Sequence, residues 1–441
     1  MKNFIKGRLQ PYKKFLGNVS VVLVANVIKI ALGVVLIPIY VRYITPGDLG
    51  KFDLIMSAVP ILNQIISMGL TNSINKFYLA GHNRAYLVYI QKKLVRHTLL
   101  LSGMLLLIYL LTYTYSRHFI SFSIFLLALS LLVLENASVV QLRIYALHEN
   151  FKRSSTVSIV KDLIRYTSLI LLVLFMEDKL LALFLGNLVS WAYLFFQTRK
   201  DNKVYLGGSA KLTEEQIAEL KAYAFPLLFL GLSGFFYLSL DRIMVGMFAD
   251  SIDQVGYLGI AQRFTTVLAL GLGSIGTVLG IRMFKTDNLP ELLKIQNRYI
   301  LFLALLITAT LFGYILFKKW VIHFLLTDRY EAAFPIGILL LMSLFWNKSR
   351  ENVEYLFLVK GETAVISKIF VFFTLLNMTL NYFFILKYNA LGAVIATNIA
   401  FFLHMSVLLF MAHRENHKIN LLPYWTGIGT NLFAVFYLAY T

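Results

Sequence analysis

The sequence predicts an all-α polytopic membrane protein with twelve core transmembrane helices arranged as two bundles of six. Composition gives the first support, because 59% of the 441 residues are hydrophobic and only 14% are charged. Soluble domains carry about 25% charged residues. The second support is the length of the apolar runs, since a helix needs ~20 residues to cross a hydrocarbon layer ~30 Å thick.

Twelve apolar runs are long enough to span a membrane. They lie at about 18–41, 52–75, 94–115, 119–142, 157–176, 179–198, 222–248, 255–281, 297–317, 331–358, 363–386 and 391–412. A thirteenth run, 424–440, is shorter and either spans the membrane or lies in its interface. The first run is too long for a signal-peptide core, which predicts a retained anchor.

The formal charge of +19 is explained by membrane topology, without nucleic acid. If the N-terminus is cytoplasmic, the segments on that side hold 27 Lys and Arg residues, and the opposite loops hold eight. Basic residues accumulate on the cytoplasmic side of membrane proteins. We therefore expect a multi-pass protein of the inner or plasma membrane with its N-terminus in the cytoplasm. The absence of cysteine excludes disulfides and thiolate metal sites.

The two halves of the chain resemble each other. TPGDLGKFDL (45–54) follows the first run as SIDQVGYLGI (251–260) follows the seventh, with Gly50 matching Gly256. We expect an N-terminal lobe at 1–200, a cytoplasmic linker at 201–221, a C-terminal lobe at 222–413 and an extension at 414–441. In the linker, Thr213 and Gln216 have the spacing of a capping box, which predicts a short amphipathic helix. Repeats of this kind commonly place a substrate site at their interface, with alternating access.

Charged residues inside the apolar runs mark the candidate site, because a charge at the centre of a membrane helix costs ~2.5–3.5 kcal/mol on insertion scales. Asn26 and Lys29 share a face of the first helix. Arg242 lies beside Asp241 near the outer end of the seventh run, and Arg263 lies about a third of the way into the eighth. Either these cations line a wet cavity or they form structural ion pairs.

The tenth run holds four charges in SLFWNKSRENVEYLFL, namely Lys348, Arg350, Glu351 and Glu354. Arg350 and Glu354 are four residues apart, a spacing that allows a pair on one helix face. Part of this charge is therefore expected to cancel within the helix.

Four acids are candidates for coupling transport to an ion, namely Glu135, Asp241, Glu351 and Glu354. Glu135 is the most isolated, with LLVL before it and NASVV after it. Burial disfavours the charged form of a carboxyl group, so Glu135 either binds a proton or pairs with a cation. A structural carboxylate would have the same sequence pattern.

One apparent nucleotide motif is rejected. The stretch 271–276 satisfies G-x-G-x-x-G, but it lies inside the eighth apolar run with no strand before it. Close helix packing explains the glycines. We expect no cofactor, no metal and no catalytic residue.

Three segments carry a resemblance to a known family. PIYVRYITPGDLGKFDLIMSAVPILNQIISMGLTNSINKFY (38–78), DRIMVGMFADSIDQVGYLGIAQRF (241–264) and LGAVIATNIAFFL (391–403) resemble the polysaccharide-biosynthesis membrane proteins of the Wzx type. These flippases of lipid-linked oligosaccharides belong to one superfamily, the MOP superfamily, with MATE transporters and lipid II flippases. The resemblance implies a MATE-like fold and a cavity with cations for a polyprenyl-diphosphate-linked oligosaccharide. Lys29, Arg242, Arg263, Lys348, Arg350 and Asn26 are the positions expected to line it.

The leading hypothesis is therefore a flippase, not an enzyme, that moves this cargo from the cytoplasmic to the outer leaflet for O-antigen, capsule or exopolysaccharide synthesis. Its expected partners are the lipid-linked cargo, membrane lipids, a coupling proton or sodium ion, and other polysaccharide-assembly membrane proteins. A MATE-type cation antiporter is one alternative, which predicts an acidic or aromatic cavity. A membrane polymerase or glycosyltransferase is another, although such enzymes usually carry a large extramembrane loop.

Overall fold

The computed structural model describes the chain at residues 24–25, 28–29, 31–33, 36–39, 41–79, 84–115, 120–148, 150–203, 211–284, 289–359, 362–414, 419 and 421–440. Over these residues the regular structure is helical, with no strand. The first helices in chain order are α2 (Pro46–Ser67), α3 (Leu70–Leu79), α4 (Arg84–Leu111), α6 (Phe122–Leu147), α7 (Phe151–Phe175), α8 (Lys179–Asp201) and α10 (Glu214–Ser239). The later helices are α11 (Asp241–Phe248), α12 (Asp253–Phe284), α13 (Leu289–Leu316), α14 (Lys318–Trp320), α15 (Ala333–Val359), α16 (Thr363–Arg414) and α17 (Leu422–Tyr440).

The chain divides by packing into two compact units. Unit 1 consists of residues 1–32 and 55–235, and unit 2 of residues 33–54 and 236–441. Two of the three boundaries fall inside α2 and α10, so that each of these helices contributes residues to both units. The segment 33–54 therefore packs with residues far along the chain.

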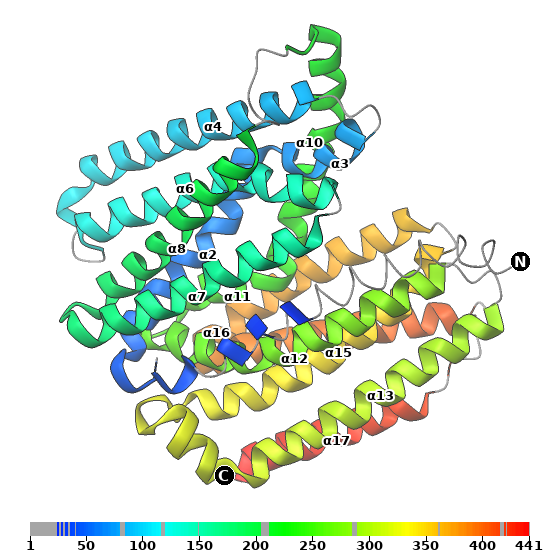
Figure 1. The fold of residues 1–441 in the computed structure, drawn as a ribbon. Coiled ribbons are helices and arrows are strands. Elements are labelled where there is room, and N and C mark those ends of the chain that lie inside the picture. The colour runs from blue at the N-terminus through cyan, green and yellow to red at the C-terminus, as the bar shows by residue number, and fades with distance from the viewer. Residues whose placement is uncertain are drawn as a thin grey trace, which may run out of the picture. The chain divides into compact units, whose positions relative to one another are not determined.

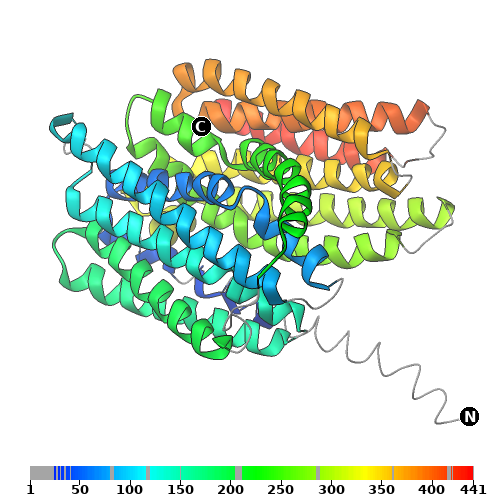
Figure 2. The same ribbon diagram turned by 90° about the horizontal axis from the view of Figure 1, so that it is seen from above.

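Unit 1 is built around a hydrophobic core from α2, α3, α4, α6 and α10. The fully buried side chains of Leu87, Ile90 and Leu94 follow one face of α4, and Leu132 and Val140 come from α6. The long helices lie side by side in the order α4, α6, α8 and α7 (Figures 1 and 2). The periodic apolar residues of each helix thus meet those of its neighbours and remove them from the surroundings.

Unit 2 has its own core between α13, α15, α16 and α17. Leu303 of α13, Phe357 of α15 and Leu408 of α16 are completely buried there. Helix α13 lies beside α17, and α15 packs against both α12 and α16 (Figure 1). Many large apolar side chains on the outer faces of both units remain exposed, which is the pattern of helices that are solvated by lipid.

The predicted fold class is confirmed: the chain is an all-α polytopic membrane protein. Over the described residues, six helices are long and apolar enough to span a membrane, at Pro46–Ser67, Arg84–Leu111, Phe122–Tyr145, Lys179–Asp201, Pro290–Leu316 and Val365–Arg414. The last of these corresponds to two predicted spans, 363–386 and 391–412. They are separated at Asn389, where the backbone torsions are not helical (φ 54°, ψ −136°). Helices such as α7 and α15 are as long, but several charged residues lie within them.

Three helix boundaries differ from those expected. Helix α7 starts at Phe151, six residues before the predicted run, so Asp162 and Arg165 lie three to four turns inside it. The predicted seventh helix is divided at Leu240 into α10 and α11. The predicted linker helix is not a separate short helix, because α10 runs without interruption from Glu214 to Ser239.

The predicted capping box itself is formed. The Gln216 backbone N–H donates to Thr213 Oγ1 at 3.2 Å, and the Thr213 backbone N–H donates to Gln216 Oε1 at 3.0 Å. Each side chain satisfies a backbone donor that the first turn of a helix leaves without a partner. The box therefore marks the start of α10.

Candidate polar site in the membrane helices

The first cluster lies in unit 1, around Lys29. The Lys29 ammonium donates a hydrogen bond to Ser158 Oγ of α7 at 2.6 Å. Lys161, one helical turn beyond Ser158, interacts electrostatically with both Lys29 and Glu135. Its ammonium also lies 3.8 Å from the centre of the Trp191 ring of α8. Two cations are thus placed close together among the membrane helices, while Asn26 lies outside the described residues.

Glu135 belongs to the same cluster. Asn63 of α2 donates its side-chain N–H to Glu135 Oε1 at 2.9 Å, and Asn136 in turn donates to Asn63 Oδ1 at 2.7 Å. The Asn63 amide of α2 thus contacts both Glu135 and Asn136 of α6, and these hydrogen bonds orient the Glu135 carboxylate. Glu135 interacts electrostatically with Lys161 and accepts a hydrogen bond from the neutral Asn63 amide.

The second cluster lies in unit 2 and is centred on Asp53 and Arg263. Arg263 Nη2 of α12 donates to Asp53 Oδ1 at 2.8 Å. The Asp53 side chain is only 4% exposed, while that of Arg263 is 24% exposed. Gly259 makes room for this carboxylate, because a Cβ atom there would overlap Asp53 Oδ2. Gly259 and Arg263 are four residues apart and therefore share one face of the helix.

Arg242 and Asp241 begin α11, next to this pair. Arg242 donates through Nε to the neutral Gln262 side chain, and its charge interacts with those of Asp53 and Arg263. Asp241 accepts hydrogen bonds from Asn381 Nδ2 at 2.8 Å and Thr397 Oγ1 at 2.9 Å. Both of these neutral donors to Asp241 lie on α16.

The tenth predicted run forms a third cluster along α15. Arg350 donates to Glu354 Oε1, as the spacing predicted, and also to Asn347 Oδ1 at 2.8 Å. Lys348 donates to Glu351 Oε2 at 2.7 Å. The Arg350 side chain is 4% exposed, so its charge is compensated inside the helix bundle.

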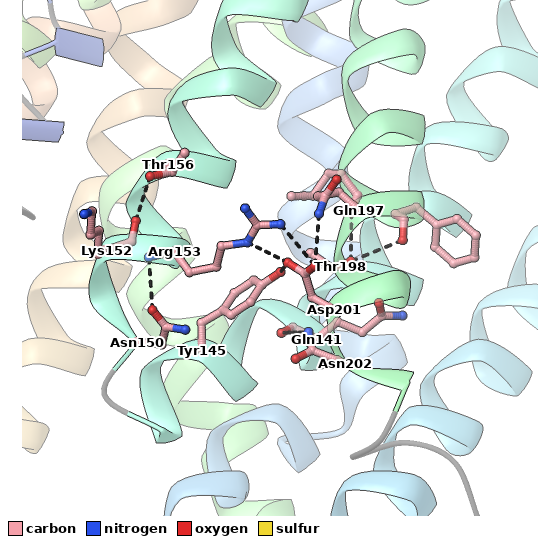
Figure 3. Close-up of polar contacts among 12 residues, drawn as sticks. Gln141, Tyr145, Asn150, Lys152, Arg153, Thr156, Gln197, Thr198, Asp201 and Asn202 are labelled. Atoms are coloured by element: carbon pink, nitrogen blue, oxygen red, sulfur yellow. Dashed lines mark hydrogen bonds and ion pairs between the residues drawn. The ribbon is translucent and has the colours of Figure 1, made fainter.

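A further ion pair joins the ends of α6, α7 and α8 (Figure 3). Arg153 donates through Nε to Asp201 Oδ2 at 2.8 Å and through Nη2 to Asp201 Oδ1 at 3.1 Å. The Tyr145 hydroxyl and the Gln197 amide donate to the same carboxylate, at 2.6 Å and 3.0 Å. Four donors from three helices converge on Asp201, an arrangement typical of a structural tie.

Several residues of these clusters were missed in the sequence, among them Asp53, Asn63, Ser158 and Lys161. Asp53 opens the predicted run 52–75, where a charge is unremarkable at a helix end, but α2 begins at Pro46 and places Asp53 two turns inside. Lys161 was assigned to a cytoplasmic segment for the same reason. Asn63 and Ser158 carry no charge, so only their partners identify them.

No metal centre is indicated by the described side chains, since no three His, Cys, Asp or Glu residues among them are grouped to hold an ion. The clusters offer ammonium, guanidinium and carboxylate groups at fixed places among apolar helices. Such groups can bind an anion or exchange a proton. Guanidinium groups in particular match the geometry of phosphate oxygens.

A family model described as "Polysaccharide biosynthesis protein" matches residues 15–280. Among the curated proteins, none matches. Among solved structures, the lipid II flippase MurJ in an inward closed conformation is similar, with a TM-score of 0.68 and 16% identity over 96% of this chain and 93% of that one. The match establishes a common fold.

Two transporters of the MOP superfamily share the fold as well. An inward-facing multidrug resistance MATE family transporter has a TM-score of 0.60 and 12% identity, over 89% of this chain and 94% of that one. A MOP superfamily transporter from Pyrococcus furiosus, described by a reverse polarity of its binding pocket, has a TM-score of 0.51 and 15% identity over 90% of this chain and 95% of that one.

Proposed function

The chain belongs to the polysaccharide biosynthesis protein family, and from that premise we propose that it is a flippase of polyprenyl-diphosphate-linked oligosaccharide. It moves this cargo from the cytoplasmic to the outer leaflet by alternating access, for the synthesis of a surface polysaccharide. The observation that supports the proposal most is the half-buried pair Arg242 and Arg263 in unit 2. A buried guanidinium group is expensive unless an anion accompanies it.

The cargo requires such cations. A diphosphate cannot enter hydrocarbon unaided, so the protein supplies positive charge while the lipid tail stays in the bilayer. Of the six predicted residues, Lys29, Arg242 and Arg263 are proposed as the main ligands, because each is half-buried among the helices; Lys29 donates to a hydroxyl, Arg242 to an amide and Arg263 to a carboxylate oxygen. Lys348 and Arg350 are held by carboxylates of their own helix, and they take a secondary role in this proposal.

The polarity of these clusters favours anionic cargo over the organic cations that a MATE-type antiporter exports. In the first cluster the charge of Lys161 interacts with those of Lys29 and Glu135, and in the second the charge of Arg242 interacts with those of Arg263, Asp53 and Asp241. For the Pyrococcus furiosus transporter, too, pocket polarity is the property linked to a different function.

Ion coupling is proposed at Glu135 or Asp241. Glu351 and Glu354 are both occupied by the cations of α15. Glu135 has a nearby ammonium and one amide donor, which suits exchange of a proton. Asp241 is surrounded by amide and hydroxyl groups of α16, whose oxygens are the ligands that hard cations such as Na⁺ prefer.

The test is a proteoliposome assay with labelled, polyprenyl-diphosphate-linked oligosaccharide in one leaflet. Purified protein is expected to move the label to the other leaflet faster than empty liposomes do. The same assay is run with an organic cation as the substrate, and with products separated to detect a new glycosidic bond. Export of the organic cation alone indicates the antiporter, and a lengthened glycan indicates a polymerase.

A further inference from the structure

Asp53 is a buried carboxylate that forms an ion pair with Arg263. The proposed function assigns the same arginine to the phosphate of the cargo. Asp53 lies two turns into α2, and its partner Arg263 lies 210 residues away on α12. Gly259 provides the notch in which the carboxylate rests against the backbone of α12. The environment of Asp53 therefore depends on α2, which carries it, and on α12, which supplies Arg263 and Gly259.

The contact between Asp53 and Arg263 is made through one carboxylate oxygen. Oδ1 accepts from Arg263 Nη2, and the buried Oδ2 has no hydrogen-bond partner among the described residues. A bidentate arginine–carboxylate pair is stronger and more specific than a pair with one hydrogen bond. The Arg153–Asp201 pair shows the contrast, since both oxygens of Asp201 accept from the same guanidinium and two further donors join them (Figure 3).

Two arginines stand near this one carboxylate. The charge of Asp53 acts on Arg242 as well as on Arg263, and the two arginines repel each other. A second anion among them would relieve that repulsion and offer more acceptor oxygens than Asp53 does. A diphosphate carries several such oxygens and can take bidentate hydrogen bonds from guanidinium groups.

We propose that Asp53 is an internal counter-anion that competes with the diphosphate of the cargo for Arg263 and Arg242. When cargo is absent, Asp53 compensates the arginine charge in the low-dielectric helix bundle. When cargo binds, its phosphate oxygens replace the carboxylate, and Asp53 takes the guanidinium back when cargo leaves. This inference rests on the proposed function and adds Asp53 to it as the positioning residue that permits release.

The consequence is an opposite effect of one substitution on binding and on transport. Asp53→Asn keeps the shape of the side chain but removes its charge, so phosphate no longer has to displace an anion. Affinity should rise about tenfold to hundredfold, the range that follows from one charge-assisted hydrogen bond. Transport should slow by a similar factor, because release of cargo has lost its competitor.

The experiment uses the full chain in nanodiscs, with inorganic pyrophosphate and a polyprenyl diphosphate as separate probes. Binding affinity and the proteoliposome transport rate are measured for wild type, Asp53→Asn and Asp53→Glu, the last of which should restore wild-type values. Asp201→Asn is the matched control, because it neutralises another 2.8 Å Asp–Arg pair and should leave both affinities unchanged. Gly259→Ala fills the notch without changing any charge, and it should mimic Asp53→Asn if that variant fails to fold.

The outcomes separate the two proposals. Tighter binding of polyprenyl diphosphate with slower transport supports the counter-anion. A wild type that binds and flips the lipid, with affinity unchanged or weakened in both Asp53→Asn and Gly259→Ala, overturns the role of Asp53 and keeps the flippase. Failure of the wild type to bind either probe or to flip the lipid overturns both proposals. Tighter binding of inorganic pyrophosphate alone assigns the arginines to a soluble anion and rejects cargo as the competitor.

Discussion

Gly50 and Gly256, which occupy matching positions in the two sequence repeats, lie against each other's helices in unit 2. A Cβ atom on Gly50 would collide with the carbonyl oxygen of Ile252, and a Cβ atom on Gly256 with that of Pro46. The first turns of α2 and α12 therefore touch through their backbones. Small residues at such crossings let membrane helices approach closely.

Replacement of Gly256 by leucine should destabilise this crossing. The new side chain has to displace backbone atoms, so we expect a large loss of folded protein, measured as the yield of monodisperse protein and the thermal midpoint in detergent. Gly103→Leu is the control, because no atom lies within 4 Å of the position of its Cβ. Equal yields and midpoints for the two variants would show that the crossing is not tightly packed.

Lys29→Ala and Arg263→Ala should each abolish transport while insertion and abundance stay near those of wild type. Both cations are half-buried among apolar helices, and both are proposed ligands of the diphosphate. The proteoliposome assay and quantification of membrane-inserted protein check this. Ser158→Ala removes the hydroxyl partner of Lys29 and should retain transport. Normal transport by Lys29→Ala or Arg263→Ala rejects that residue as a required ligand, and loss of the protein indicates a structural role.

Membrane orientation is expected to place positions 82, 205 and 287 in the cytoplasm. Single cysteines there should react in intact cells only with membrane-permeant thiol reagents, whereas those at Tyr115, Ser251 and Tyr388 should also react with impermeant ones. The chain has no other cysteine to react. Gly47 is avoided, because a Cβ atom there would lie 2.8 Å from Asp253 Oδ1. Labelling of position 205 by an impermeant reagent would reverse the proposed topology.

Glu135→Gln should bind cargo but lose the response of transport to an imposed pH gradient. Glutamine imitates the protonated acid and can still contact Asn63, so the link between α6 and α2 is kept. Transport is measured in proteoliposomes with and without a pH gradient, beside Asn63→Ala as a control for the hydrogen bond alone. A variant that keeps the wild-type pH response excludes Glu135 as the coupling acid.

Asp241→Asn is the corresponding test for sodium. If Asp241 holds the coupling ion, Na⁺ should raise the thermal midpoint of the wild type and leave that of the variant unchanged. A ligand that binds only the folded protein stabilises it, and the effect grows with the ligand concentration relative to its dissociation constant. K⁺ at the same ionic strength is the control, and equal shifts by Na⁺ and K⁺ would argue against a specific site.

Much of the fold could be predicted because lipid imposes a simple rule on sequence. A spanning helix has to be long and apolar, so runs such as 297–317 coincide with the observed α13 within a turn at one end and eight residues at the other. Boundaries were missed where polar residues continue the helix beyond the apolar run. In α7 the first six residues, from Phe151 to Thr156, are largely polar, yet backbone hydrogen bonds continue through them.

The charged residues of the site were predicted in part, and the residues that were missed share a cause. Charge alone reveals Lys29 and Arg263, because an ionised group is costly in hydrocarbon wherever it points. The partner of a charge depends on tertiary packing, and Asp53 approaches Arg263 only because Gly259 leaves space on a helix two hundred residues away. The pair Arg350 and Glu354 was predictable, since both residues lie on one helix and no packing is needed to bring them together.

The break at Asn389 also bears on how the protein enters the membrane. The two arms of α16 turn directly at this residue, and Asn389 exchanges two hydrogen bonds of 2.9 Å with Asp250. Because Asn389 alone separates the two arms, we expect Thr363–Arg414 to insert into the bilayer as one helical hairpin. An epitope tag placed at this tip is then expected to reduce the amount of membrane-inserted protein.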